Sequence, residues 1–112
     1  MTLETIITNS FNKNVIIHCP TYEDARYFLT AYWYRHYHIE LDDMSISKNK
    51  SLAKAAISTM LYGYTRFGEN TCYNISNGDI SPISLDYITK YGLNYDFTLI
   101  TNKDIQRTDS ID

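Results

Sequence analysis

The residues best suited to covalent chemistry are the adjacent His18 and Cys19, which end a run of β-branched residues. A cysteine between a strand and a helix N-terminus has the setting that lowers a thiol pKa, and cysteine-dependent phosphatases pair such a cysteine with an arginine in the same loop. In those enzymes five residues separate the cysteine from the arginine, whereas six separate Cys19 from Arg26. Glu23 and Asp24 would also repel an anionic substrate. We therefore expect Cys19 to be a buried structural residue and the protein not to be an enzyme.

The residue types that ligate zinc are present, but their spacing is wrong for a local site. None shows the Cys-x-x-Cys or helical His-x-x-x-His spacing of such a site, and His36 and His38 would diverge on a helix. We expect no metal site, and a zinc site assembled from distant positions remains the alternative. The candidate ligands would be His18, Cys19, His36, His38 and Cys72.

No motif for a cofactor is visible either. The chain has no nucleophile elbow around a serine and no glycine-rich loop that could hold a dinucleotide or a triphosphate. A small-molecule site is still compatible with the composition, because tyrosines and Trp33 can stack on a nucleobase while Arg26, Arg35 or Arg66 meets a phosphate. This combination would make the protein a ligand-sequestering module.

Length and composition indicate one globular domain rich in tyrosine. The chain has 112 residues, of which 44% are hydrophobic, 21% are charged and 11 are tyrosines, which are enriched at protein interfaces. An AT-rich genome is the alternative explanation for this tyrosine content. We expect a single domain over 1–112 with frayed ends at about 1–12 and 101–112.

The net charge and the hydropathy pattern exclude two classes of partner. A net charge of −3 argues against direct nucleic-acid binding, which needs a clustered basic surface. No apolar run is long enough to cross a bilayer, and the acidic N-terminus does not resemble a signal peptide. Cys19 and Cys72 are too few for a disulfide framework. We expect a cytoplasmic protein with reduced thiols.

The first half of the chain predicts a strand followed by a helix. Residues 15–19 are a buried strand because β-branched residues pack well in a sheet. Thr21 then caps a helix that runs to about Tyr37. The polar residues 1–13 predict a frayed lead-in or a short edge strand.

The second half predicts a hairpin and a final helix and strand. The Asn77-Gly78 pair favours a tight turn because both residues tolerate positive φ. In order, we expect a loop over 42–50, a short helix from Ser51, strands over 62–67 and 71–75, the hairpin turn, a helix over 85–91 and a strand over 95–99. This order predicts an α+β fold, a small antiparallel-rich sheet with two or three helices packed on one face.

The helix from Thr21 to Tyr37 has more apolar surface than one core needs. At 100° per residue, one arc is assigned to the core, and it contains Ala25, Phe28, Leu29, Tyr32 and His36. A second stripe on the other side is a candidate interface, and it contains Tyr27, Ala31, Tyr34 and His38. Isolated exposed tyrosines, which need no function, are the alternative. With neighbouring aromatic and acidic residues, the full candidate interface is Tyr27, Trp33, Tyr34, Tyr37, His38, Asp42 and Asp43.

Two segments carry a resemblance to a known group of proteins. The residues 15–21 followed by Glu23-Asp24-Ala25 and Phe28-Leu29, and later 71–75 with Gly78, resemble small uncharacterised proteins carried by phages and mobile elements of Gram-positive bacteria. The resemblance covers roughly residues 11–99, except that the segment 45–61 departs from the pattern. Its motifs are structural rather than catalytic, so they indicate a scaffold more than an activity.

Anti-CRISPR proteins are similar to this chain in size, charge and lack of catalytic residues. The analogy implies an inhibitor that binds a CRISPR nuclease of a bacterial defence system, with acidic side chains against the basic nucleic-acid channel and tyrosines in apolar pockets. Asp42 and Asp43, with Glu69 or Asp79, are the candidate acidic residues. We expect stoichiometric protein binding by a homodimer in the host cytoplasm. The alternative is a module that sequesters a nucleotide signal of host defence.

Overall fold

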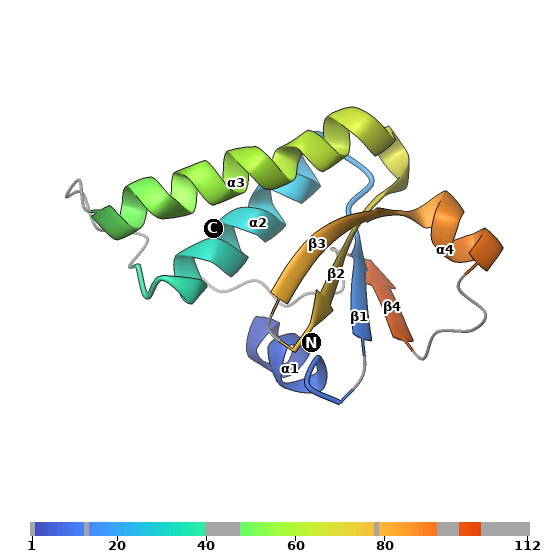
Figure 1. Cartoon of the computed structure of the whole chain (residues 1–112), viewed down its shortest axis with the longest axis horizontal. Helices are drawn as coiled ribbons and strands as arrows, with labels where there is room; N and C mark the ends of the chain where they lie inside the picture. Colours follow the sequence, from blue (N-terminus) through green and yellow to red (C-terminus); the bar gives the residue numbers. More distant parts are fainter. Residues whose placement is uncertain (1, 13, 40–47, 78, 92–96, 102–112) are drawn as a thin grey trace.

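A four-stranded sheet with the order β3-β2-β1-β4 is the centre of the computed structural model, which describes residues 2–12, 14–39, 48–77, 79–91 and 97–101. The strands are β1 (Asn14–His18), β2 (Thr71–Ser76), β3 (Asp79–Ser84) and β4 (Phe97–Thr101). β1, β2 and β3 pair antiparallel, and β4 pairs parallel with β1 (Figure 1). The sheet is therefore mostly antiparallel.

Two long helices, α2 (Tyr22–His36) and α3 (Lys48–Phe67), lie side by side over one face of this sheet, and the short helix α1 (Leu3–Asn9) lies on the same side near its lower end (Figure 1). The described part of the chain also contains the short helix α4 (Leu85–Tyr91) and a 3-10 turn η1 (Gly68–Asn70) after α3. The ring of Tyr22 at the start of α2 meets that of Tyr64 near the end of α3, at 6.0 Å between centroids. The two helices are thus antiparallel, and the predicted α+β class is confirmed.

The strands divide their side chains between two cores. Val15 and Ile17 of β1 face the long helices together with Tyr73 of β2, whose ring lies 6.0 Å from that of Phe28 in α2. Alternate residues point to the other face, where Ile16 packs in a smaller cluster that includes Ile88 of α4. α4 therefore covers part of the sheet face opposite the long helices.

Several local predictions are confirmed. Asn77 has φ of 53° in the turn between β2 and β3, as the hairpin prediction requires. The Thr21 hydroxyl accepts a hydrogen bond of 3.1 Å from the backbone N–H of Asp24, so Thr21 caps α2. The helix over 85–91 is α4, and the strand predicted over 95–99 is found as β4 at 97–101, with residues 95 and 96 outside the described part of the chain.

The strand predicted over 62–67 is wrong, because these residues form the last part of α3. The aromatic content of the segment favours a strand. However, Ile57, Leu61 and Tyr64 recur at the three- and four-residue spacing of a helix and pack on the main core. Tertiary packing along α3 thus outweighs local β propensity. α3 also begins at Lys48, three residues before the start predicted at Ser51.

The N-terminal segment is a helix and not an edge strand. In α1, Leu3 and Ile6 are buried in the main core, and Thr2 caps the helix by accepting from the N–H of Thr5. The carbonyl of Ser10 accepts a 2.9 Å hydrogen bond from the N–H of Asn77, which ties this segment to the hairpin. Two isoleucines in a polar segment were too weak a signal to predict this packing.

Among the described residues, no helix is long and apolar enough to cross a bilayer. Of the frayed tail predicted over 101–112, Thr101 instead ends β4, and residues 102–112 lie outside the described residues, as do most of the loop predicted over 42–50 and Gly78.

Candidate functional site

Aromatic and imidazole rings gather at the C-terminal end of α2. The Trp33 ring lies 5.3 Å from that of Tyr32, 5.1 Å from that of His36 and 5.9 Å from that of Tyr37, measured between centroids. His36 and Tyr37 also meet edge to face at 4.9 Å. We call Tyr32, Trp33, His36 and Tyr37 the α2 ring cluster. Because each ring touches another, their rotamers are restrained before any partner binds.

The way α2 ends places His38 beside this cluster. The N–H of His38 donates to the carbonyl of Arg35 at 3.1 Å, and the N–H of Ile39 donates to that of Tyr34 at 2.8 Å. This pair of bonds is a Schellman motif, in which His38 occupies the left-handed position with φ of 57°. Glycine is the usual residue there, so His38 adopts a backbone conformation that residues with a side chain rarely take.

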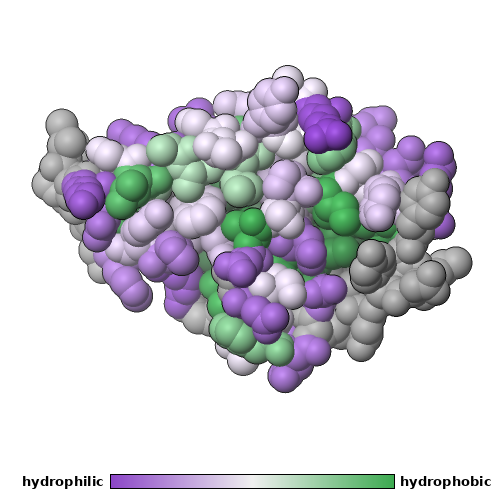
Figure 2. Space-filling view, viewed as in Figure 1, coloured by the Kyte–Doolittle hydropathy of each residue, from purple (hydrophilic) through white to green (hydrophobic). Residues whose placement is uncertain are grey.

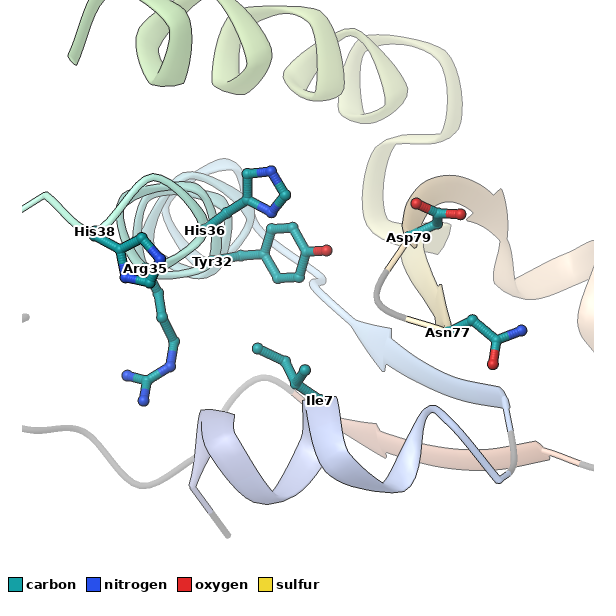
Figure 3. Close-up of a pocket in the computed structure, with 7 residues that line it drawn as sticks. All are labelled: Ile7, Tyr32, Arg35, His36, His38, Asn77 and Asp79. Atoms are coloured by element: carbon teal, nitrogen blue, oxygen red, sulfur yellow. The ribbon is translucent and has the colours of Figure 1, made fainter. Parts of the chain in front are cut away.

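A pocket of about 420 Å³ opens between the end of α2, α1 and the β2–β3 turn (Figure 3). α2 contributes Tyr32, Arg35 and His36, and the phenol of Tyr32 points across the pocket toward the turn in Figure 3. The remaining lining residues are Ile7, His38, Asn77 and Asp79. Segments far apart in the sequence therefore form one pocket.

The pocket has opposite charges on its two sides. Arg35, His36 and His38 stand at the helix end, whereas Asp79 stands at the hairpin. Burial raises the pKa of Tyr32, and the carboxylate of Asp79 raises it further, so the phenol stays protonated and is able to donate a hydrogen bond. The site provides donors on one wall and a carboxylate acceptor on the other.

The two cysteines are not placed for nucleophilic chemistry. Cys19 and Cys72 are free thiols with 0% exposure. Desolvation raises the pKa of Cys72 to about 12, and that of Cys19 rises through desolvation and the nearby Cys72 and Asp24. A reactive cysteine needs the opposite, a lowered pKa and access to substrate. The neighbouring His18 is engaged elsewhere, since its Nε2 lies 2.8 Å from the carbonyl oxygen of Glu69.

Within the described part of the chain, no three His, Cys, Asp or Glu side chains lie close enough to share a metal ion. His36 and His38 come near one pocket, as Figure 3 shows, but Cys19 and Cys72 lie inside the fold. The sequence-based candidates for zinc are thus split between separate places.

The residues of the predicted interface differ in their surroundings. Tyr27, Trp33, Tyr34 and Tyr37 are half-buried and His38 is exposed, whereas Asp42 and Asp43 lie outside the described residues. Ala31, placed in the same stripe by the sequence, is only 9% exposed and belongs to the core. Tyr34 also packs against that core. The outer stripe is therefore interrupted, and Trp33 and Tyr37 belong with the ring cluster.

The prediction that His36 is a core residue is wrong, because His36 is exposed. The last turn of α2 extends past the sheet in Figure 1, so the face that is buried earlier in the helix opens onto the pocket there. Sequence reasoning also missed the pocket roles of Ile7 and Asn77. No local signal identifies them, because the pocket forms only when the hairpin and α1 meet α2.

The surface over α3 is mixed rather than uniformly apolar. Figure 2 shows hydrophobic residues in separate small areas along α3 and near the end of β3, with hydrophilic residues between them. Tyr62 of α3 is 69% exposed and Leu52 is 42% exposed. α3 also contains no acidic residue, so all 13 acidic residues lie elsewhere in the chain.

Comparisons with known proteins give no relative. No protein-family model matches the chain, and neither a curated protein nor a solved structure matches it.

Proposed function

We propose that this protein is a phage-type inhibitor of a bacterial defence system that acts by stoichiometric protein binding, most specifically an anti-CRISPR protein that blocks a CRISPR-associated nuclease. The observation that carries the proposal is the α2 ring cluster, in which Trp33 and Tyr37 are half-buried and held by ring contacts. Trp and Tyr are enriched among the hot spots of protein interfaces, and side chains that are already ordered lose little entropy on binding.

The charge distribution supports a particular orientation on the target. The nucleic-acid channel of a nuclease is basic, so an inhibitor in it should present acidic rather than basic surface. α3 carries Lys48, Lys54 and Arg66 without an acidic residue, which makes it the less suitable face. Asp79 at the hairpin supplies a carboxylate beside the ring cluster, and Arg35 at the α2 end would meet an acidic group of the target. We therefore place the target at the α2 end and the hairpin, with α3 turned away.

The burial of both thiols is consistent with this mode of action. An inhibitor that acts by contact needs no nucleophile, and the buried thiols remain protonated at neutral pH. The proposed setting is the host cytoplasm, where the protein would act as a homodimer.

The test is a titration of the purified protein into DNA-cleavage reactions containing purified Cas9-type nucleases of Gram-positive bacteria. Stoichiometric inhibition predicts that cleavage falls linearly and ends at a fixed molar ratio, whereas a catalytic inactivator would act at far lower ratios. The double variant Trp33→Ala with Tyr37→Ala should lose inhibition while retaining its circular dichroism spectrum. Tyr62→Ala is the matched control, because this more exposed tyrosine lies on α3. Full cleavage by every nuclease, or equal inhibition by both variants, would contradict the proposal.

The homodimer is tested separately by light scattering of Tyr27→Ala with Tyr34→Ala. A dimer that uses the stripe should become a monomer, with a melting curve recorded because Tyr34 also packs on the core. An unchanged mass would remove the stripe from the dimer interface.

A further inference from the structure

A stripe of exposed residues runs along α3 on the side that faces away from the core. At 100° per residue its members fall within an arc of about 80°, and each of them is exposed. α3 lies at the outer edge of the molecule in Figure 1, with α2 and the sheet on its inner side. We call these residues the α3 outer stripe: Lys48, Leu52, Ala55, Thr59, Tyr62 and Arg66.

The spacing within this stripe is that of a helix which meets another helix. Its members alternate four and three residues apart, which is the heptad spacing of coiled-coil contacts. The inner side of α3 already packs within the domain, where Ala53, Ile57 and Gly63 are buried. The core of the domain therefore does not account for the outer stripe.

The middle of the stripe has two large apolar side chains with two small residues between them. Leu52 is 42% exposed, and Tyr62, at 69%, is the most exposed large hydrophobic residue that the structure describes. The hydroxyl of Thr59 donates to the carbonyl of Ala55 at 2.9 Å, so a partner that covers Thr59 leaves no hydroxyl donor unpaired. A second helix can approach closely over the small residues, with Tyr62 as the anchor of the contact.

Basic residues stand at both ends of the stripe. Lys48 and Arg66 are roughly 27 Å apart along the helix axis, and α3 contains no acidic residue. The guanidinium of Arg66 lies over the ring of Phe67, 5.3 Å from its centroid, which orders the side chain without neutralising its charge. Because the whole chain has a net charge of −3, this basic helix differs from the rest of the molecule. A complementary partner carries carboxylates at both ends and apolar residues between them.

Two other occupants match the stripe less well. A second α3 packed antiparallel would place Lys48 against Arg66 of the other copy, and a parallel one would place each basic residue against itself, so repulsion opposes a dimer through this surface. Nucleic acid requires closely spaced basic residues along its phosphates. Between Leu52 and Tyr62, however, the only charged residue is Lys54.

We infer that the α3 outer stripe binds an amphipathic α-helix of a partner protein, one that carries acidic residues at both ends of an apolar heptad stripe. This surface shares no residue with the α2 ring cluster. The inference therefore goes beyond the inhibitor function and does not depend on it.

The probe is a display library of helical peptides of 20 residues, the length of α3, randomised along one face. Selection uses the immobilised wild-type protein with an excess of the free Leu52→Ala, Tyr62→Ala double variant, so that only peptides that need the stripe are retained. Both substitutions are at exposed positions and should preserve the circular dichroism spectrum. Enriched peptides should have more Asp and Glu than Lys and Arg, placed at the two ends of an apolar stripe.

Fluorescence anisotropy of the most enriched peptide then assigns the contacts. Tyr62→Ala should weaken binding about tenfold, whereas Tyr87→Ala, at an exposed tyrosine of α4, should behave as wild type. Lys48→Glu and Arg66→Glu should each weaken binding, and together by about tenfold or more, whereas Lys90→Glu in the last turn of α4 should not.

A further variant separates this surface from the proposed inhibitor function. Trp33→Ala with Tyr37→Ala changes the ring cluster and should bind the peptide as tightly as wild type. Loss of nuclease inhibition in that variant with peptide binding retained would show that the two surfaces act independently.

Three results would overturn the inference. The first is no enrichment over selection on a blank support. The second is an enriched peptide that has no excess of acidic residues or that binds Tyr62→Ala as tightly as wild type. The third is a short DNA duplex that binds the wild-type protein more tightly than the peptide and displaces it, which would make α3 a nucleic-acid surface.

Discussion

Replacing Gly63 by alanine tests how closely α3 approaches β3. A Cβ atom at Gly63 would lie 2.7 Å from the Cβ of Pro82 and 3.4 Å from its Cγ. Carbon atoms in good contact are about 3.5–4.0 Å apart, so helix and strand must separate by about 1 Å. The Pro82 ring is bonded to the backbone and has no rotamer by which to yield.

The expected change in the free energy of unfolding is the difference between two opposing effects. Alanine gains about 1 kcal/mol over glycine inside a helix. Overpacking of a close contact costs about 1–3 kcal/mol, and a rigid neighbour favours the upper end. We expect Gly63→Ala to lower the free energy of unfolding by about 2 kcal/mol, which is roughly 8 °C in Tm for a domain of this size.

Urea denaturation followed by circular dichroism measures this change, and two further variants isolate its cause. Ala55→Gly, at an exposed position of α3, calibrates helix propensity and should cost about 1 kcal/mol. In a Pro82→Gly background the opposing Cβ is absent, so Gly63→Ala should become neutral or stabilising. A Gly63→Ala protein as stable as wild type, or equally destabilised in both backgrounds, would refute the close approach.

Three other predictions concern the core and the helix cap. Because burial raises the pKa of Cys19 and Cys72 above the ordinary 9.0, their stabilising effect is complete below about pH 9 and is lost as pH rises. At about pH 10.5 each thiol should lower the free energy of unfolding by about 2 kcal/mol, measured by urea denaturation in reductant. In a Cys19→Ala, Cys72→Ala protein the free energy of unfolding should change less with pH. Tyr73→Phe removes the 3.0 Å hydrogen bond to the Met60 carbonyl and should lower Tm by the equivalent of about 1 kcal/mol; an unchanged Tm would show that the bond contributes nothing. Thr21→Ala should cost about 1 kcal/mol by thermal denaturation, with Thr21→Ser close to wild type, and equal losses in the two would exclude the cap.

The ring cluster and the pocket are neighbours, since Tyr32 and His36 belong to both. A protein partner that covers Trp33 and Tyr37 would therefore also contact residues that line the pocket.

The sequence by itself determined the elements whose signals are local. Thr21 begins a helix because its hydroxyl satisfies a free N–H, Asn77 forms a turn because it tolerates positive φ, and the β-branched residues 15–17 make a buried strand. Each depends on residues close together in the chain. The α+β class follows from their order.

Only the tertiary structure decided which elements meet. Residues 62–67 have the composition of a strand, but packing against α2 and the sheet holds them in α3. Ile6 and Ile7 became part of a helix because α1 packs against the same core as α2, and β4 joined β1 in parallel through pairing of distant residues. The pocket depends on the placement of α1 and of the hairpin against α2, since its lining residues at 7, 32–38 and 77–79 are far apart along the chain. Local sequence patterns determine backbone geometry and buried faces, whereas a site formed between elements depends on contacts that no short segment contains.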